Sequence, residues 1–320
     1  MIRIFFLLTG LLLYFIQHFT QPVPLKLQVI ALIAGVILLG VPHGAADLLV
    51  AAKNAAGKNR QFSSRAFHTK YLLRMMLFGC LLWLAPLAGY ILFILFAAYH
   101  FGETDLNRYL TNSLFGKIYV TAYGLVILAV IFLTHLQELK PVSGTIEAGD
   151  YQTILINNIQ RFSFFIVPAI ISSFILLSAF YFHYNVIKLK SQALIIGQFS
   201  ILLFILYNLP VIAGFTFYFV GWHSVLSLKY IGEYLQKDGL NTTKNIARQI
   251  TFYSLLAIGG MLFFAGAGFV FFNNSSPTFY IFLGLAVLTA PHIHIMYDMY
   301  KNISCKRNQE NNISVQPSLR

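Results

Sequence analysis

Ten long apolar stretches, separated by short polar connectors, make up most of this 320-residue chain. A helix needs roughly 20 predominantly apolar residues to cross the hydrocarbon core of a membrane, and the stretches approach or exceed this length. Only 10% of the residues are charged and 58% are hydrophobic, whereas soluble domains carry about 25% charged residues. The chain lacks the polar groups to cover a water-exposed surface, so we expect an all-α, polytopic bundle of transmembrane helices.

The predicted spans cover residues 3–19, 26–50, 70–85, 87–107, 113–135, 161–183, 191–208, 210–230, 249–272 and 278–299. Pro86 and Pro210 fall in tight connections, because proline lacks a backbone N–H and keeps the preceding residue out of the α region. The third and fourth stretches can also form one broken helix, which gives nine spans. We expect residues 1–304 to form a single transmembrane domain and residues 305–320 to form a polar, disordered cytoplasmic tail.

The charges of the connectors predict the orientation of the bundle. The connector 51–70 carries five basic residues and no acidic residue, whereas the connector 136–160 carries three acidic residues and one basic residue. With ten spans, basic connectors alternate with connectors that are poor in basic residues. Because basic connectors face the cytoplasm, we expect a multi-pass protein of the inner (cytoplasmic) membrane with both termini in the cytoplasm.

Two further classes of protein are excluded by composition. The formal net charge of +12 suggests nucleic acid, but the basic residues lie mostly in connectors and in the tail, and no basic patch has interleaved aromatic residues. We therefore expect no nucleic-acid partner. Cys80 and Cys305 offer neither a disulfide framework nor the spacing of a zinc site.

Four apolar stretches are interrupted by histidine: His43 in the second span, His100 in the fourth, His223 in the eighth and His292 in the tenth. All four spans run in the same direction across the predicted membrane. Each histidine precedes the first basic residue at the cytoplasmic end by 6 to 10 residues, which places it roughly 9–15 Å inside that boundary at 1.5 Å per residue. The sequence therefore predicts that four imidazoles from four helices share one layer of the membrane.

Carboxylates accompany these histidines. Asp47 follows His43 by four residues, on the same helical face, and Glu103 follows His100 by three. A ligating imidazole usually donates its second N–H to a carboxylate or a carbonyl, which fixes its tautomer and orientation. We expect Asp47 and Glu103 to orient the histidines from behind and not to act as ligands. Asp105 and Asp298 are further acidic neighbours of the same stretches.

Four converging neutral imidazoles suit iron, zinc, copper or haem. A single histidine in a membrane helix is often a hydrogen-bonding group between helices, and a relay of histidines and carboxylates also suits a proton-coupled transporter or channel. Paired histidines can instead be axial ligands of a haem. His294 lies two residues from His292 and points to a different side of the helix, so either of them can supply the fourth imidazole.

The stretches around these histidines resemble those of a known family. "PHGAAD" (42–47), "YHFGETD" (99–105), "GWHS" (221–224) and "PHI" (291–293) occur in the same order as in the Brp/Blh family of membrane β-carotene 15,15′-dioxygenases. The resemblance covers residues from about 30 to 300. It implies a polytopic membrane enzyme that holds Fe(II) through histidines and cleaves the central double bond of β-carotene with O₂ to give retinal.

Carried over by position, the resemblance implies His43, His100, His223 and His292 as metal ligands. It implies membrane lipid as the surroundings, a lipophilic carotenoid and O₂ as substrates, and a retinal-binding rhodopsin as an acceptor of the product. The chain departs from the family at one position: the family commonly has a second histidine four residues after the one in "WHS", where this chain has Ser227. Because serine is a poor ligand for iron, this departure affects the expected ligand set and the choice of carotenoid.

Overall fold

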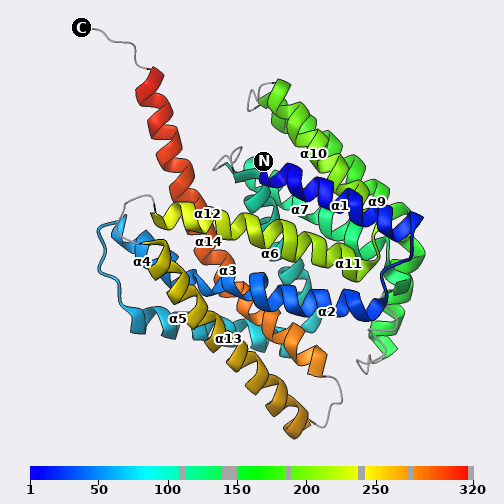
Figure 1. Cartoon of the computed structure of the whole chain (residues 1–320), viewed down its shortest axis with the longest axis horizontal. Helices are drawn as coiled ribbons and strands as arrows, with labels where there is room; N and C mark the ends of the chain where they lie inside the picture. Colours follow the sequence, from blue (N-terminus) through cyan, green and yellow to red (C-terminus); the bar gives the residue numbers. More distant parts are fainter. Residues whose placement is uncertain (108–112, 139–149, 185–188, 237–241, 273–276, 316–320) are drawn as a thin grey trace.

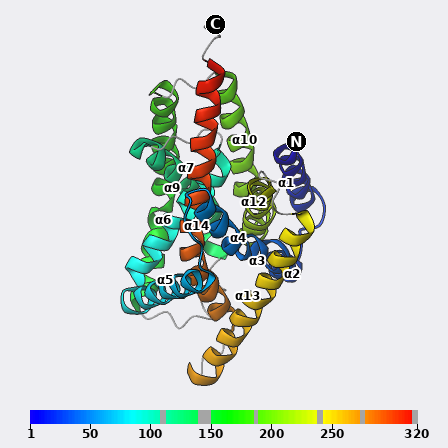
Figure 2. The ribbon, with the colours of Figure 1, turned by 90° about the vertical axis from the view of Figure 1, so that its left-hand side faces the viewer.

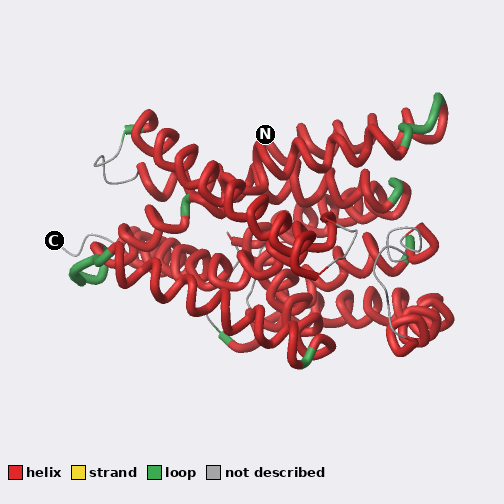
Figure 3. The backbone as a smooth tube through the Cα atoms, turned by 90° about the horizontal axis from the view of Figure 1, so that it is seen from below, coloured by secondary structure: helices red, strands yellow, loops and turns green. Residues whose placement is uncertain are grey.

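A computed structural model describes residues 1–107, 113–138, 150–184, 189–236, 242–272 and 277–315. Residues used in the orientation and depth arguments lie outside these ranges, among them Arg108, the first basic residue after His100, and Glu147 of the connector 136–160. The described part of the chain is helical and contains no strand, as Figure 3 shows. The prediction of an all-α bundle is therefore confirmed.

A helix forms at each of the ten predicted places. The second and eighth spans are interrupted by turns of π-helix, and several helices extend beyond the predicted bounds, most of all those predicted at 161–183 and 278–299. The first half of the chain contains α1 (Ile2–Phe19), α2 (Leu25–Gly35), the π-helix η1 (Val36–Gly40), α3 (Val41–Ala45), α4 (Asp47–Ala56), α5 (Ser64–Leu84), α6 (Pro86–Leu106) and α7 (Leu114–Leu133). The second half contains α9 (Asp150–Tyr184), α10 (Leu189–Asn208), α11 (Val211–Phe215), the π-helix η3 (Thr216–Ser224), α12 (Val225–Gln236), α13 (Thr243–Phe272) and α14 (Pro277–Val315).

Eight helical segments in the described ranges are long and apolar enough to cross a membrane. The segments α5 and α14 are not among them, and the cations Arg65, Lys70 and Arg74 lower the mean hydropathy of α5. The chain does break between the third and fourth predicted spans, because α5 ends at Leu84 and α6 begins at Pro86.

The distribution of exposed side chains is that of a membrane protein. Leu38, Trp83 and Phe164 are at least 69% exposed, whereas His100, Asp105 and the other polar groups of the central region are almost fully buried. Apolar groups outside and polar groups inside suit a protein whose solvent is lipid. The structure thus supports a multi-pass membrane protein.

The core centres on α7, which packs against α6 and α9 (Figure 1). Tyr119 of α7 stacks on Tyr181 of α9 with ring centroids 4.0 Å apart. The contact between α6 and α7 is so close that a Cβ atom on Gly102 would lie 2.0 Å from the carbonyl oxygen of Val120, and one on Gly124 would lie 1.9 Å from that of Ala98. Only glycine permits this approach of two backbones, and it holds α6 firmly against the core.

Helix α14 passes through the bundle, packs against α4, α5 and α6, and its C-terminal end extends beyond the other helices (Figures 1 and 2). It continues as far as Val315, into the tail for which the sequence predicts disorder, and residues 316–320 lie outside the described ranges. This path brings His292, in the middle of α14, to the elements that carry the other three histidines.

Candidate metal centre

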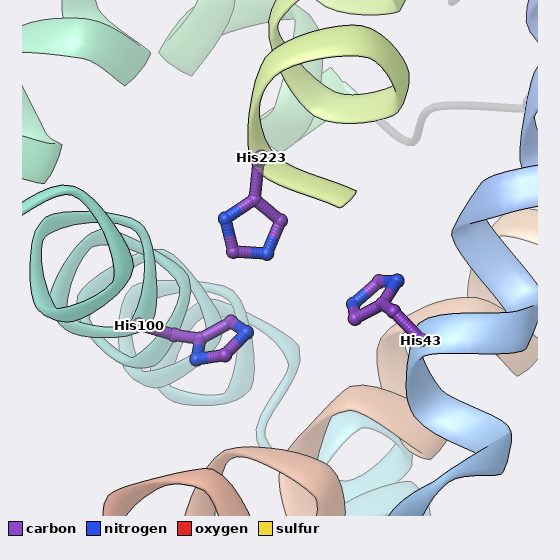
Figure 4. Close-up of side chains that lie close together, drawn as sticks. All are labelled: His43, His100 and His223. Atoms are coloured by element: carbon purple, nitrogen blue, oxygen red, sulfur yellow. The ribbon is translucent and has the colours of Figure 1, made fainter. Parts of the chain in front are cut away.

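The four histidines singled out in the sequence lie together in the interior of the bundle. His43 comes from α3, His100 from α6, His223 from η3 and His292 from α14, and all four are buried. Figure 4 shows the rings of His43, His100 and His223 pointing toward one another from three different helices. Each of these three rings offers a nitrogen, and the three nitrogen atoms lie within 4.8 Å of one another.

The backbone around these histidines departs from regular α-helix. Pro42 directly precedes His43 and Pro291 directly precedes His292, and proline inside a helix removes a backbone hydrogen bond and bends the axis. His223 lies within the π-helix η3, and η1 ends three residues before His43. Turns of π-helix recur at functional sites because the wider turn redirects side chains. These irregularities aim rings from separate helices at a common point.

His292 adjoins the group of three. Its Nε2 atom lies 3.3 Å from Nε2 of His100, and its ring centroid is 4.9 Å from those of both His43 and His100. His294 is exposed and lines a cavity that none of the four clustered histidines borders. Of the two residues that the sequence leaves open for the fourth position, His292 is therefore the one that faces the other histidines.

Asp47 is buried and reaches the cluster through His292. Nδ1 of His292 donates to Oδ1 of Asp47 over 2.8 Å, and the hydroxyl of Tyr71 donates to Oδ2 of Asp47 over 3.0 Å. A neutral His292 that donates from Nδ1 carries its lone pair on Nε2, the atom that faces His100. Asp47 thus orients the histidine of α14 and not its own sequence neighbour, His43.

A break in the helix between His43 and Asp47 explains why Asp47 does not contact His43. Helix α3 ends at Ala45, and α4 begins at Asp47, with Ala46 between them at a ψ of −6°. The four-residue spacing puts two side chains on one face only if the helix is continuous. Asp47 therefore contacts His292 and not the residue that its spacing indicates, and its role in orienting a metal ligand stays a prediction.

Three ring nitrogens of the cluster are buried without a hydrogen-bond partner among the described residues: Nδ1 of His100, and both Nδ1 and Nε2 of His223. Leaving a buried polar atom unpaired costs roughly 1–3 kcal/mol. A metal ion would use such lone pairs, and three neutral imidazoles within reach of one another fit a borderline divalent ion such as Fe(II). The residues present thus fit the group that the resemblance implies.

Glu103 is buried beside the cluster, and Oε1 accepts a hydrogen bond from the Tyr99 hydroxyl over 3.0 Å. Its Oε2 atom has no partner in the described part of the chain. Since neither oxygen reaches a histidine ring, its role in orienting a ligand stays a prediction. Ser227, the position of the departure from the family, is fully buried one helical turn beyond His223.

A second carboxylate network, which the sequence alone did not reveal, supports His223. Asp105 accepts hydrogen bonds from Nε1 of Trp222 over 2.8 Å and from the Tyr218 hydroxyl over 3.3 Å. The guanidinium of Arg3, from α1, hydrogen-bonds to the backbone oxygen of Asp105. Because Trp222 precedes His223 directly, this network ties η3 to α6 at the cluster. The sequence places Asp105 close to His100, but it does not reveal that Arg3 and Trp222, each more than a hundred residues away, lie beside it.

Aromatic side chains enclose the cluster on one side. Phe101 and Phe219 lie 4.6 and 6.2 Å from the ring of His223, and Phe219 stacks on Phe215 at 5.3 Å. These rings present an apolar surface next to the histidines and limit the access of water.

Comparisons with known proteins identify the family of the chain. The family model described as β-carotene 15,15′-dioxygenase matches residues 34–300. A relative named β-carotene 15,15′-dioxygenase, from an uncultured marine bacterium (66A03), is 24% identical over 264 residues, which cover 82% of this chain and 90% of the relative. No solved structure matches the chain. The matched range includes all four clustered histidines, and the chain belongs to the β-carotene 15,15′-dioxygenase family.

Proposed function

We propose that this protein is a membrane oxygenase that holds Fe(II) and cleaves β-carotene, or a related carotenoid, at its central double bond to give retinal. The observation that carries the proposal is the convergence of His43, His100 and His223, whose ring nitrogens lie within 4.8 Å of one another inside a chain of this family. His292 is proposed as the fourth ligand, since its Nε2 atom adjoins that of His100.

The reaction balances with O₂ as the only co-substrate. The C15=C15′ bond breaks, one oxygen atom goes to each of the two carbons, and two aldehydes form, so that neither an external reductant nor a proton is consumed. When bound, Fe(II) supplies the one-electron chemistry that lets triplet O₂ react with a closed-shell polyene.

The side chains of this protein would hold and shield the reacting groups. The hydrogen bond from His292 Nδ1 to Asp47 keeps the lone pair of Nε2 directed at the cluster. Phe101 and Phe219 offer flat apolar faces beside His223, against which a polyene can pack while water is excluded. A carotenoid would reach this region from the bilayer, where it already resides.

The geometry favours a bare ion over a haem, one of the alternatives left open by the sequence. A haem would need to fit between opposed rings, whereas three rings meet here at centroid separations of 4.7 to 6.5 Å.

The decisive experiment is expression of the chain in a bacterium that accumulates β-carotene, followed by extraction and chromatography of the pigments. Loss of β-carotene with the appearance of retinal is the expected result. The triple variant H43A/H100A/H223A is the matched control and should leave β-carotene intact. If this variant forms as much retinal as the unaltered protein, the proposed site is wrong.

The orientation and the partners complete the proposal. We place the protein in the inner membrane with both termini in the cytoplasm, and we propose a retinal-binding rhodopsin as the acceptor of the product. Reporter fusions after Phe19 and after Tyr300 test the orientation. In a ten-span arrangement, a cytoplasmic reporter after Tyr300 and a periplasmic reporter after Phe19 are expected.

A further inference from the structure

A cavity of about 210 Å³ lies between α4, α5 and α14, and none of the four clustered histidines lines it. These helices are neighbours in the bundle, since α14 packs against both α4 and α5 (Figure 1). The residues that line it and matter here are Lys58, Arg60, Lys70, Arg74, His294 and Asp298. The proposed reaction assigns no role to this cavity.

The charge of the lining is strongly positive. Four cations face one carboxylate, Asp298, whose Oδ2 atom lies 3.8 Å from Nζ of Lys58. The other three cations form no ion pair within the part of the chain that the structure describes. Like charges gathered on a concave wall repel one another and raise the local concentration of anions. The positive lining of the cavity therefore favours the binding of an anion.

The types of cation favour a phosphate group. Arg60 and Arg74 each offer a planar fork of N–H donors that matches two oxygens of a phosphate, and Lys58 and Lys70 add point charges. Lys58 and Arg60 come from the loop after α4, and Lys70 and Arg74 come from α5, so the four cations converge from two separate segments. Basic residues that only set the orientation of a membrane protein do not need to line one cavity together.

The surroundings favour a lipid as the source of that phosphate. Leu73 and Leu77 follow Lys70 and Arg74 by three residues on α5, and both are more than half exposed. An acyl chain can lie along these leucines while its headgroup enters the cavity. The cations also belong to the connector 51–70 and the start of α5, on the side of the membrane predicted to be cytoplasmic, where anionic lipids attract basic segments.

We propose that this cavity binds the phosphate group of an anionic phospholipid. The phosphate is held by Arg60, Arg74, Lys58 and Lys70, and the apolar surface of α5 carries an acyl chain. Tyr71 lines the same cavity and donates to Asp47, so the bound headgroup lies next to the network that orients His292. The proposal does not depend on the reaction that the histidine cluster performs.

The test measures the affinity of the full-length protein for phosphatidylglycerol by native mass spectrometry in detergent, with phosphatidylcholine as the reference lipid. The variant K70Q/R74Q removes two cations from the cavity. The control K244Q/R248Q removes two exposed cations from α13, outside the cavity, with the same change in net charge. Each cation near an anionic lipid contributes about fivefold, so the site variant should bind phosphatidylglycerol roughly 30-fold more weakly. The control should bind like the unaltered protein.

A third variant gives an effect of the opposite sign. D298N removes the carboxylate and releases Lys58, so it should bind phosphatidylglycerol severalfold more tightly. If K70Q/R74Q unfolds at a lower temperature than the unaltered protein, the affinity of D298N is sufficient to test the proposal. Equal loss in K70Q/R74Q and in the control would overturn the proposal, because diffuse charge would then explain the binding. Unchanged affinity in D298N would overturn it as well. Tighter binding of inorganic phosphate than of phosphatidylglycerol would overturn the assignment to a lipid.

Discussion

Asp47 and His292 are 245 residues apart in the chain, and Oδ1 of Asp47 lies 2.8 Å from Nδ1 of His292. This contact joins α4 to α14 directly beside the cluster of ring nitrogens. It gives His292 one tautomer, with the lone pair of Nε2 toward His100.

Replacing Asp47 should therefore weaken metal binding without removing a ligand. Loss of a carboxylate that supports a ligating histidine typically costs 10–100-fold in metal affinity or activity. We expect D47A to bind Fe(II) about 10–100-fold more weakly, measured by titration of the apoprotein with Fe(II) under anaerobic conditions. The matched control is D298N, because Asp298 pairs with Lys58 in the separate cavity. Equal losses in the two variants would contradict the proposed role of Asp47.

The sequence was sufficient to predict the helices and the meeting of the histidines. Long apolar runs have no stable alternative to helix in a membrane, because the backbone must satisfy its own hydrogen bonds. The charges of the connectors then predict that His43, His100, His223 and His292 lie at a common depth in the membrane. Rings from four helices at one depth inside a bundle have only a small volume in which to lie.

The contacts around the site could not be predicted in the same way. The spacing of Asp47 from His43 implies a shared face only along an unbroken helix, and the chain is interrupted at Ala46. The network of Asp105 depends on Arg3 and Trp222, whose proximity follows from the packing of α1 and η3 and leaves no periodic pattern. Local spacing predicts neighbours along a helix, but not which helix lies opposite.

The three histidines with converging nitrogens should each be necessary for the bound ion. We expect H43A, H100A and H223A to lose most of the iron that the unaltered protein retains after purification, as measured by elemental analysis, and to form no detectable retinal. H292A separates two ligand sets: a four-histidine site predicts a similar loss, whereas a three-histidine site predicts that most of the iron is kept. Full iron content in any of the first three variants would remove that residue from the site.

Removal of the metal should be reversible in the unaltered protein. Because neutral imidazoles are the proposed ligands, a strong Fe(II) chelator should abolish retinal formation, and anaerobic addition of Fe(II) should restore it. Addition of Zn(II) in place of Fe(II) should not, because zinc has no redox chemistry. Pigment analysis of detergent-solubilised protein with added β-carotene is the measurement. Retinal formation that persists in the chelated, metal-free protein would contradict an iron-dependent reaction.

The close packing of α6 against α7 should make Gly124 intolerant of a side chain. A Cβ atom there would lie 1.9 Å from the carbonyl oxygen of Ala98, and forcing atoms into a filled core typically costs about 1–3 kcal/mol. We expect G124A to lower the Tm of the detergent-solubilised protein by several degrees. The control is G197A on α10, where a Cβ atom meets nothing within 4 Å. An unchanged Tm in G124A would contradict the close contact of α6 and α7.

Asp105 should hold η3, and with it His223, through Trp222. The indole Nε1 atom donates to Oδ1 of Asp105 over 2.8 Å in a fully buried setting, and a hydrogen bond to a charged group contributes about 1.5–3 kcal/mol. The chain contains two tryptophans, and Trp83 is 77% exposed, so a W83F background leaves Trp222 as the only indole fluorophore. In that background D105A should lower the Tm and shift the emission of Trp222, because the indole loses its acceptor. It should also reduce retained iron, although Asp105 is no ligand. The control D298N should leave the emission of Trp222 and the retained iron unchanged. An unshifted emission in D105A would mean that Trp222 does not depend on this carboxylate.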